Sequence, residues 1–257
     1  MGQFLCIELL IGKEKLKKIH DSGVTIVGLG AVGSYATEAL ARAGVGRLRL
    51  VDFDRIKPTN LNRHIYALGS TIGRAKAAVA KERVLDINPS CEAEALEIFA
   101  ASEVMDRIFD NGPDLVIDAI DSLNPKTQVL SYCYKKRIPV ISSMGAATRT
   151  DPSLIRYADI FDTRNCPLAK RLRVKLKEDG VGRGIRCVYS TEPRNTSAVD
   201  RENLGSEDEY KRGRKRSKLG SLPTITGIFG LTVAHYAIEA LCEGLNNNLR
   251  SIRNDVP

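Results

Sequence analysis

The glycine motif Gly28-x-Gly30-x-x-Gly33 constrains the fold of this chain more than any other part of the sequence. It follows a β-branched apolar run, residues 24–27, and precedes apolar residues at helical spacing over residues 32–43. Glycines at a strand-to-helix turn permit a tight bend and a close approach of backbone to phosphate, and the helix N-terminus offers N–H groups to an anion. The motif predicts the start of a Rossmann-like nucleotide-binding fold, although a plain dinucleotide oxidoreductase would carry the same pattern.

The rest of the first half continues the alternation of strands and helices. Short apolar runs at residues 48–51, 114–118 and 139–142 predict strands, and residues 71–85 and 126–136 predict helices. Strands that alternate with helices imply right-handed crossovers and a mainly parallel sheet. We therefore predict an α/β fold with a Rossmann-like, mainly parallel sheet flanked by helices.

The second half is less regular. Residues 153–160 and 185–190 predict two strands around a basic helix at residues 168–177, which would form a C-terminal extension of the sheet. Residues 191–220 are polar and show little periodicity, which is typical of either a mobile functional loop or a disordered segment, and we expect a mobile crossover loop here. A terminal helix is expected to begin near residues 221–223, where serine can cap and proline fits the first turn.

Length and hydropathy bound the domain organisation. The 257 residues suffice for one large α/β domain, and we predict a single domain, 1–257, with a nucleotide-binding half (1–145) and a C-terminal half (146–257). The longest apolar stretch, residues 222–242, contains threonines, a histidine and a glutamate, so we expect no membrane span. The N-terminus has its basic residues after its apolar run, the reverse of a secretory signal, which makes a cytoplasmic location the default.

Two cations separate this chain from a hydride-transferring enzyme. Asp52 ends the second expected strand, where a carboxylate can accept hydrogen bonds from ribose hydroxyls. A polar loop then carries Arg63, and Lys76 follows in the next expected helix. Breaking a phosphoanhydride builds negative charge on pyrophosphate, which fixed cations stabilise, whereas nicotinamide chemistry has no such need. For either cation alone, a solvated surface charge would be the simpler interpretation.

Further motifs complete a recognisable set. In chain order they are Val51-Asp52-Phe53-Asp54, Thr59-Asn60-x-Asn62-Arg63, Lys76 and Asp118-x-x-Asp121. On these residues the chain resembles the family of ubiquitin-activating-like adenylating enzymes over nearly its whole length. Segments at 141–146, 188–192 and 220–223 make it most similar to the branch that acts on N6-threonylcarbamoyladenosine in tRNA.

The resemblance implies a function. Such enzymes are homodimers that use ATP and Mg²⁺ to adenylate a carboxylate on the N6-threonylcarbamoyl group of a tRNA adenosine, and ring closure then expels AMP. The alternatives are adenylation of the C-terminal glycine of a ubiquitin-like sulfur-carrier protein, a catalytically silent scaffold that binds a partner, and an NAD oxidoreductase. A sulfur-relay protein is a further possible partner.

The resemblance also implies roles for the site residues. Gly28, Gly30 and Gly33 would cradle the ATP phosphates, and Asp52 would hold the ribose. Contacts with the phosphates would come from Asn60, Arg63 and Lys76. Asp121 would lie near Mg²⁺, and Arg63, Lys76 and Asp121 would be the catalytic residues. The alternative role for Asp121 is that of a helix cap.

Cysteines and a missing arginine mark departures within the family. Aligning Leu10-Ile11-Gly12 places Cys6 where relatives tend to carry an arginine, so either the N-terminus is unusual here or the phosphate site has one cation fewer. No C-x-x-C pair occurs, so we expect no structural zinc. No cysteine lies between Cys187 and Cys242, which fits a reaction that closes a ring within its substrate, and we interpret Cys187 as a small buried hydrophobe rather than a reactive thiol.

A modest positive charge suits an RNA partner. Lysine and arginine exceed aspartate and glutamate by 39 to 31, a surplus also common in proteins that bind no nucleic acid. The densest basic cluster, Lys211 to Lys218, is the best local candidate for a tRNA phosphate contact, and the basic helix at 168–177 is the second. The alternative for the cluster is a solvated charge run that the adjacent acidic residues neutralise.

Overall fold

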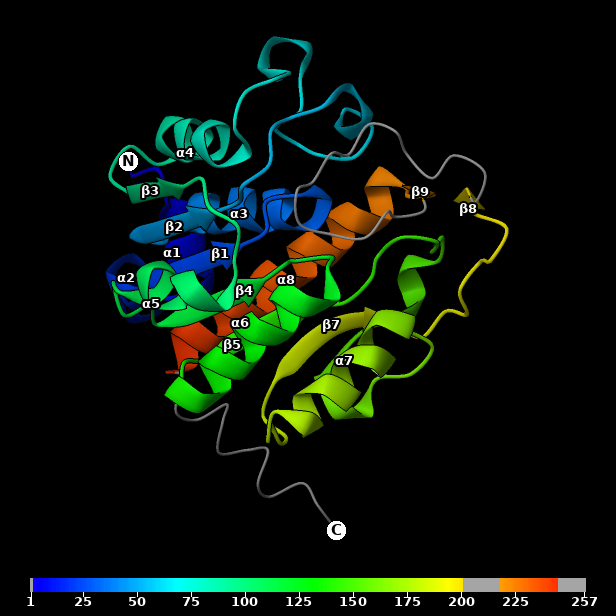
Figure 1. Ribbon diagram of the computed structural model, residues 1–257. Coiled ribbons are helices and arrows are strands. Elements are labelled where there is room, and N and C mark those ends of the chain that lie inside the picture. The colour runs from blue at the N-terminus through cyan, green and yellow to red at the C-terminus, as the bar shows by residue number, and fades with distance from the viewer. Residues whose placement is uncertain (1, 201–217, 245–257) are drawn as a thin grey trace.

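A seven-stranded sheet forms the centre of the protein. The computed structural model describes residues 2–200 and 218–244 (Figure 1). The sheet has the strand order β3-β2-β1-β4-β5-β7-β6, in which all neighbours are parallel except β6 and β7. The strands are β1 (Gly23–Val27), β2 (Arg47–Val51), β3 (Glu92–Leu96), β4 (Leu115–Asp118), β5 (Val140–Ser143), β6 (Ile155–Asp159) and β7 (Arg186–Ser190).

The remaining elements are helices and one small ribbon. The α-helices are α1 (Leu5–Ile11), α2 (Lys13–Asp21), α3 (Ala31–Ala43), α4 (Lys76–Ile87), α5 (Met105–Phe109), α6 (Leu123–Lys136), α7 (Pro167–Glu178) and α8 (Pro223–Glu243). The strands β8 (Val199–Asp200) and β9 (Lys218–Leu219) form an antiparallel pair apart from the main sheet. These elements confirm the predicted α/β fold, with β7 and β6 as the C-terminal sheet extension.

Helices cover both faces of the sheet and divide the core in two. In β4, Leu115 and Ile117 face one apolar cluster while Val116 faces the other, as the two-residue period of a strand requires. The first cluster includes residues of α3, α4 and α8, and the second includes residues of α5, α6 and α7. In Figure 1, α6 and α7 lie in front of the sheet and α3 and α8 lie behind it.

The terminal helix α8 is a core element. Its 21 residues are long and apolar enough to cross a membrane by length and composition alone, but 61% of its most apolar window is buried inside the molecule. Phe229 and Val233 have no exposed surface and belong to the first cluster. The polar residues that made a span unexpected from the sequence therefore accompany a helix that packs on the sheet.

Three expectations from the sequence differ from the structure. The helix expected at residues 71–85 begins at Lys76, because Gly73 has φ +83° and Ala75 is extended and pairs with Arg55. Ser221 does not cap α8: the residue before the helix is Leu222, although Pro223 does occupy the first position. Strand β3 and the N-terminal helices α1 and α2 were not expected.

Candidate active site

The carboxyl ends of three central strands meet at one place. Val27, the last residue of β1, lies beside Val51 of β2 and Asp118 of β4. The backbone continues this pairing past the strand ends: the Gly28 N–H donates to the Val51 carbonyl (2.9 Å) and the Ala119 N–H to the Val27 carbonyl (2.8 Å). The glycine motif, Asp52 and the segment after β4 therefore come together at the edge where α/β sheets bind ligands.

The three glycines of the motif are required for different reasons. Gly28 has φ +93°, and a Cβ there would lie 2.9 Å from the Ala119 carbonyl. A Cβ on Gly33 would lie 1.8 Å from the Gly28 oxygen, because the first turn of α3 packs directly on the loop. A Cβ on Gly30 would meet no atom within 4 Å. Two glycines therefore shape the loop, while the third leaves open space at the N-terminus of α3, a position that can accept an anion.

Asp52 is held in place by the backbone on both sides. Its Oδ2 accepts from the Leu29 N–H (2.7 Å) and its Oδ1 from the Asp54 N–H (2.8 Å). Burial raises the pKa of this carboxyl above its usual range, and the positive charge of Lys76 and the two backbone hydrogen bonds act against that rise. Each carboxylate oxygen keeps a second lone pair, so a pair of ribose hydroxyls could still donate to Asp52.

Lys76 lies beside Asp52 and pairs with a second carboxylate. Its Nζ is 2.8 Å from Asp54 Oδ2, and the side chain is 9% exposed. The Lys76 N–H also donates to the Asp54 carbonyl (2.9 Å), which ties the first residue of α4 to the end of β2. The interpretation of Lys76 as a solvated surface charge is therefore wrong.

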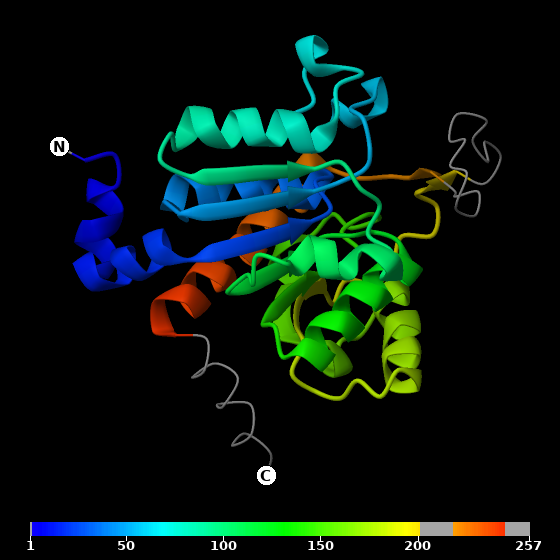
Figure 2. The ribbon, with the colours of Figure 1, turned by 60° about the vertical axis from the view of Figure 1, so that its left-hand side comes forward.

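An excursion of the chain, residues 55–75, carries the other expected phosphate contacts. Its two ends are joined by hydrogen bonds from the Ile56 N–H to the Arg74 carbonyl (2.9 Å) and from the Gly73 N–H to the Ile56 carbonyl (2.8 Å). Figure 2 shows this excursion rising beside α4, past the tips of the parallel strands. Asn60 Oδ1 accepts from the Lys57 N–H (3.1 Å), and the Arg63 guanidinium donates to the Thr59 carbonyl (2.9 Å). The hydrogen bonds of Asn60 and Arg63 therefore stabilise the turn at residues 57–63 in which both residues lie.

His64 is a site residue that the sequence did not single out. It is 4% exposed, its Nε2 bonds to the Leu29 carbonyl, and its Nδ1 accepts from the Tyr66 N–H (3.2 Å). Burial, followed by the positive charge of Lys76, lowers the pKa of His64 to about 4. Residues 55–75 therefore contact the glycine loop through the neutral imidazole of His64.

A buried ion pair supports the segment after β4. Lys126 Nζ lies 2.7 Å from Asp118 Oδ2, with both side chains fully buried, and it also donates to the Ile120 carbonyl (2.9 Å). Ser142 of β5 donates to the same carboxylate oxygen (2.7 Å). This network fixes the backbone that leads to Asp121. The sequence motif included Asp118, but its buried pairing with Lys126 was not expected.

Asp121 itself is exposed at the same edge of the sheet. The residue at the N-cap of α6 is Ser122, so Asp121 stands one position before the cap, and its Oδ1 accepts from the Ser122 hydroxyl (3.2 Å). Within residues 2–200 and 218–244, no group of three histidine, cysteine or acidic side chains is placed to hold a metal. A single carboxylate matches the way Mg²⁺ binds beside substrate phosphates, with waters completing its shell.

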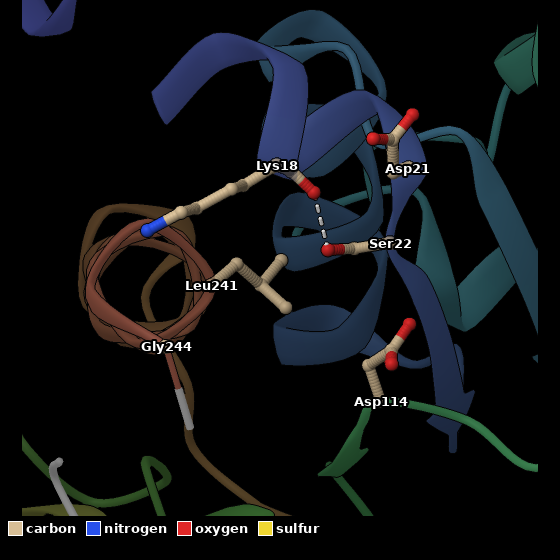
Figure 3. Close-up of a pocket in the computed structure, with 6 residues that line it drawn as sticks. All are labelled: Lys18, Asp21, Ser22, Asp114, Leu241 and Gly244. Carbon is tan, nitrogen blue, oxygen red and sulfur yellow. Dashed lines mark hydrogen bonds between the residues drawn. The ribbon is translucent and has the colours of Figure 1, made fainter. Parts of the chain in front are cut away.

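Two other features, the Cys187 thiol and a surface hollow, do not belong to this site. Cys187 is buried in β7, and burial raises the pKa of its thiol, so it stays protonated as a small hydrophobe. A surface hollow between α2, α8 and the start of β4 is lined by Lys18, Ser22 and Asp114 among others (Figure 3). It lies at the amino ends of the strands, opposite the glycine motif.

Comparisons with known proteins agree with this geometry. A tRNA threonylcarbamoyladenosine dehydratase of Bacillus subtilis is 41% identical over 248 residues, covering 95% of this chain and 96% of the relative. A crystal structure of the Escherichia coli tRNA N6-threonylcarbamoyladenosine dehydratase in complex with ATP superimposes with a TM-score of 0.84 at 33% identity, covering 95% of this chain and 96% of that chain. A molybdopterin-synthase adenylyltransferase of Salmonella typhimurium is 36% identical over 140 residues, or 54% of each chain. The ThiF family model matches residues 5–255, and the chain belongs to the ThiF family.

Proposed function

We propose that this protein is an ATP-dependent adenylate-forming enzyme that dehydrates N6-threonylcarbamoyladenosine in tRNA. The observation that carries the proposal is the full-length similarity to a dehydratase at 41% identity, together with a glycine loop open at Gly30 beside Asp52 and Lys76. The similarity to a carrier-protein adenylyltransferase covers 54% of the chain, which makes that activity the second candidate.

The proposed reaction has two steps whose atoms balance. A carboxylate oxygen of the substrate attacks the α-phosphorus of ATP, the α,β-anhydride bond breaks, and pyrophosphate leaves. An atom of the same substrate then attacks the activated carbonyl and closes a ring, and AMP leaves with the former carboxylate oxygen. The proton released on ring closure completes the loss of one water from the nucleoside.

The residues of the site have distinct tasks in these steps. Gly28, Gly30 and Gly33 let the loop approach the phosphates, and Asp52 orients the ribose through its remaining lone pairs. Lys76 and Arg63 supply positive charge where pyrophosphate departs, and Asn60 shapes the turn that carries Arg63.

Mg²⁺ belongs to the proposal as a companion of ATP. Asp121 would hold it, because this exposed carboxylate follows β4 at the edge where the glycine loop lies. When bound, the ion neutralises charge on the phosphate oxygens.

The decisive experiment is mass spectrometry of nucleosides from tRNA that carries N6-threonylcarbamoyladenosine. Incubated with the protein, ATP and Mg²⁺, the modified adenosine should lose one water. Lys76→Ala should lower the rate by roughly 10²- to 10³-fold, because a fixed charge that stabilises the leaving pyrophosphate is lost. Lys81→Ala, on the same helix, is the matched control and should retain activity.

Other outcomes of the same experiment are informative. An unchanged nucleoside mass with intact ATP binding would refute dehydration, and ATP–pyrophosphate exchange that depends on a carrier protein with a C-terminal glycine would establish the second candidate. Unchanged turnover in folded Lys76→Ala protein would remove that lysine from the mechanism.

The partners and cellular context follow from the same proposal. We infer a homodimer, which light scattering would report as twice the chain mass, and a single-domain organisation with halves at 1–145 and 146–257. A sulfur-relay protein partner and a cytoplasmic location remain predictions from the family resemblance. The basic cluster proposed for tRNA contact falls on residues 211–217, which lie outside the described residues, and on Lys218 at their edge.

A further inference from the structure

The Leu29 peptide groups are held from two sides. The Leu29 N–H donates to Asp52 Oδ2 (2.7 Å), and the Leu29 carbonyl bonds to His64 Nε2. Asp52 follows β2, whereas His64 lies in residues 55–75. Two separate segments of the chain therefore form hydrogen bonds with Leu29 of the glycine loop.

The second nitrogen of His64 settles which atom carries the proton. Nδ1 accepts from the Tyr66 N–H (3.2 Å), so it must be bare, and the proton lies on Nε2. The imidazole therefore donates to Leu29, and it has to stay neutral to make both bonds. Its burial and the nearby cations Lys76 and Arg63 favour the neutral form.

The geometry of the peptide bond transmits this contact to Gly30. In a trans peptide the carbonyl of one residue and the N–H of the next lie in one plane and point in opposite directions. A Leu29 carbonyl held toward His64 thus aims the Gly30 N–H away from His64. No hydrogen-bond partner for that N–H is found among residues 2–200 and 218–244. A Cβ atom placed on Gly30 would also have no other atom within 4 Å, so the space beside Gly30 is open.

We propose that His64 is a positioning residue that orients the Gly30 N–H as a donor to a phosphate oxygen of the nucleotide. The inference rests on the proposed use of ATP but not on the identity of the second substrate. It predicts that His64 contributes to binding of the phosphates and leaves recognition of the nucleoside unchanged.

The test compares ATP and adenosine affinities by calorimetry on the full chain. His64→Phe keeps a ring of similar size but removes the donor, and it should weaken ATP binding about 3- to 10-fold, the range of one neutral hydrogen bond. Adenosine affinity should stay constant. His64→Gln, whose Nε2 can donate to the Leu29 carbonyl, should restore ATP affinity to within about 3-fold of the wild type.

A neighbouring substitution separates positioning from general destabilisation. Tyr66→Phe removes the hydroxyl that donates to the Ser34 carbonyl (2.9 Å), so it should lower the melting temperature without changing the ratio of ATP to adenosine affinity. The inference would be overturned, with the proposed function intact, if His64→Phe had the wild-type ratio of ATP to adenosine affinity. The same holds if His64→Gln bound ATP as weakly as His64→Phe does. A wild-type protein that binds no ATP would overturn both the inference and the proposed function.

Discussion

Gly30 and Gly33 offer a paired test of what the glycine loop does at the level of single residues. Gly33→Ala would place a Cβ 1.8 Å from the Gly28 oxygen, so the loop and α3 must separate, and we expect a loss of a few kcal/mol in the free energy of unfolding (about 1–3 kcal/mol). Gly30→Ala meets open space at φ −76°, so the fold should keep its stability while ATP binding weakens. Denaturation and nucleotide titration of both variants measure the difference, and equal destabilisation by the two would contradict it.

His64 should also make the stability of the protein depend on pH. Its pKa is about 4 in the folded chain and 6.5 ordinarily, so between these values the unfolded chain binds a proton that the folded chain does not. Stability should therefore fall as pH decreases from 6.5 toward 4, by at most about 1.4 kcal/mol per pH unit, and His64 should contribute nothing above that window. The groups that face it, Lys76, Arg63 and the Tyr66 ring, supply no negative charge that would reverse the sign.

Urea denaturation at several pH values measures this effect. His64→Gln has no titrating group at this position, so its profile should be flatter than that of the wild type across the window. Parallel profiles would show that His64 has the same pKa in the folded and the unfolded chain, which would contradict the prediction.

The positions of single residues were predictable where their chemical type suits a nucleotide site, and their roles there stay predictions. Asp52 and Lys76 could be expected beside a glycine motif because nucleotides need a ribose acceptor and a phosphate cation. His64 could not, because its role depends on a turn that brings residue 64 to residue 29, and no local pattern encodes that contact.

Among the elements, α6 depends on a buried charge pair for its position against β4. Lys126→Met would leave the Asp118 carboxylate uncompensated in the core, which should cost about 3–5 kcal/mol of stability. The double change Asp118→Asn with Lys126→Met should recover much of that loss, since the buried charge is then removed. The exposed pair Lys17–Asp21 is the control, and Lys17→Met should cost less than about 1 kcal/mol. A single Lys126→Met variant as stable as the wild type in urea would refute this account.

The start of α4 and the edge strand β3 could not be predicted from local sequence patterns. Helix periodicity extended α4 back to residue 71, but Gly73 takes a left-handed conformation and the chain stays extended until Lys76. Strand β3 reads Glu-Ala-Glu-Ala-Leu, and its alternating glutamates gave no apolar run, because an edge strand packs fewer residues in the core. The other six strands of the sheet were predicted, most of them from short apolar or β-branched runs.

At the scale of the whole molecule, the sequence predicted a parallel sheet but not its order. Strand order follows from pairing between distant segments, such as β5 with β7 across the intervening β6 and α7. The antiparallel β6 forms one edge of the sheet, and neither its direction nor its position has a signature in local periodicity.

The net charge of +8 gives a prediction for the complete chain with tRNA. Neutralising Lys211, Arg212, Arg214, Lys215 and Arg216 should weaken tRNA binding and flatten its dependence on salt, because fewer counterions are released on binding. Neutralising Lys13, Lys15 and Lys17 of α2 removes surface charge elsewhere and is the control. An equal salt slope in the first variant and the wild type would locate the tRNA contact elsewhere on the protein.

The position of Lys76 at the very start of α4 has one more consequence. Backbone dipoles make the N-terminus of a helix electropositive, so a carboxylate in the first turn is stabilising and a cation there is not. Helix α4 has none there: it begins with a cation, and no side chain caps it, while Asp54 supplies the compensating charge from outside the helix. A bound polyanion would add negative charge at this N-terminus, so the first turn of α4 should fray less when the nucleotide is bound.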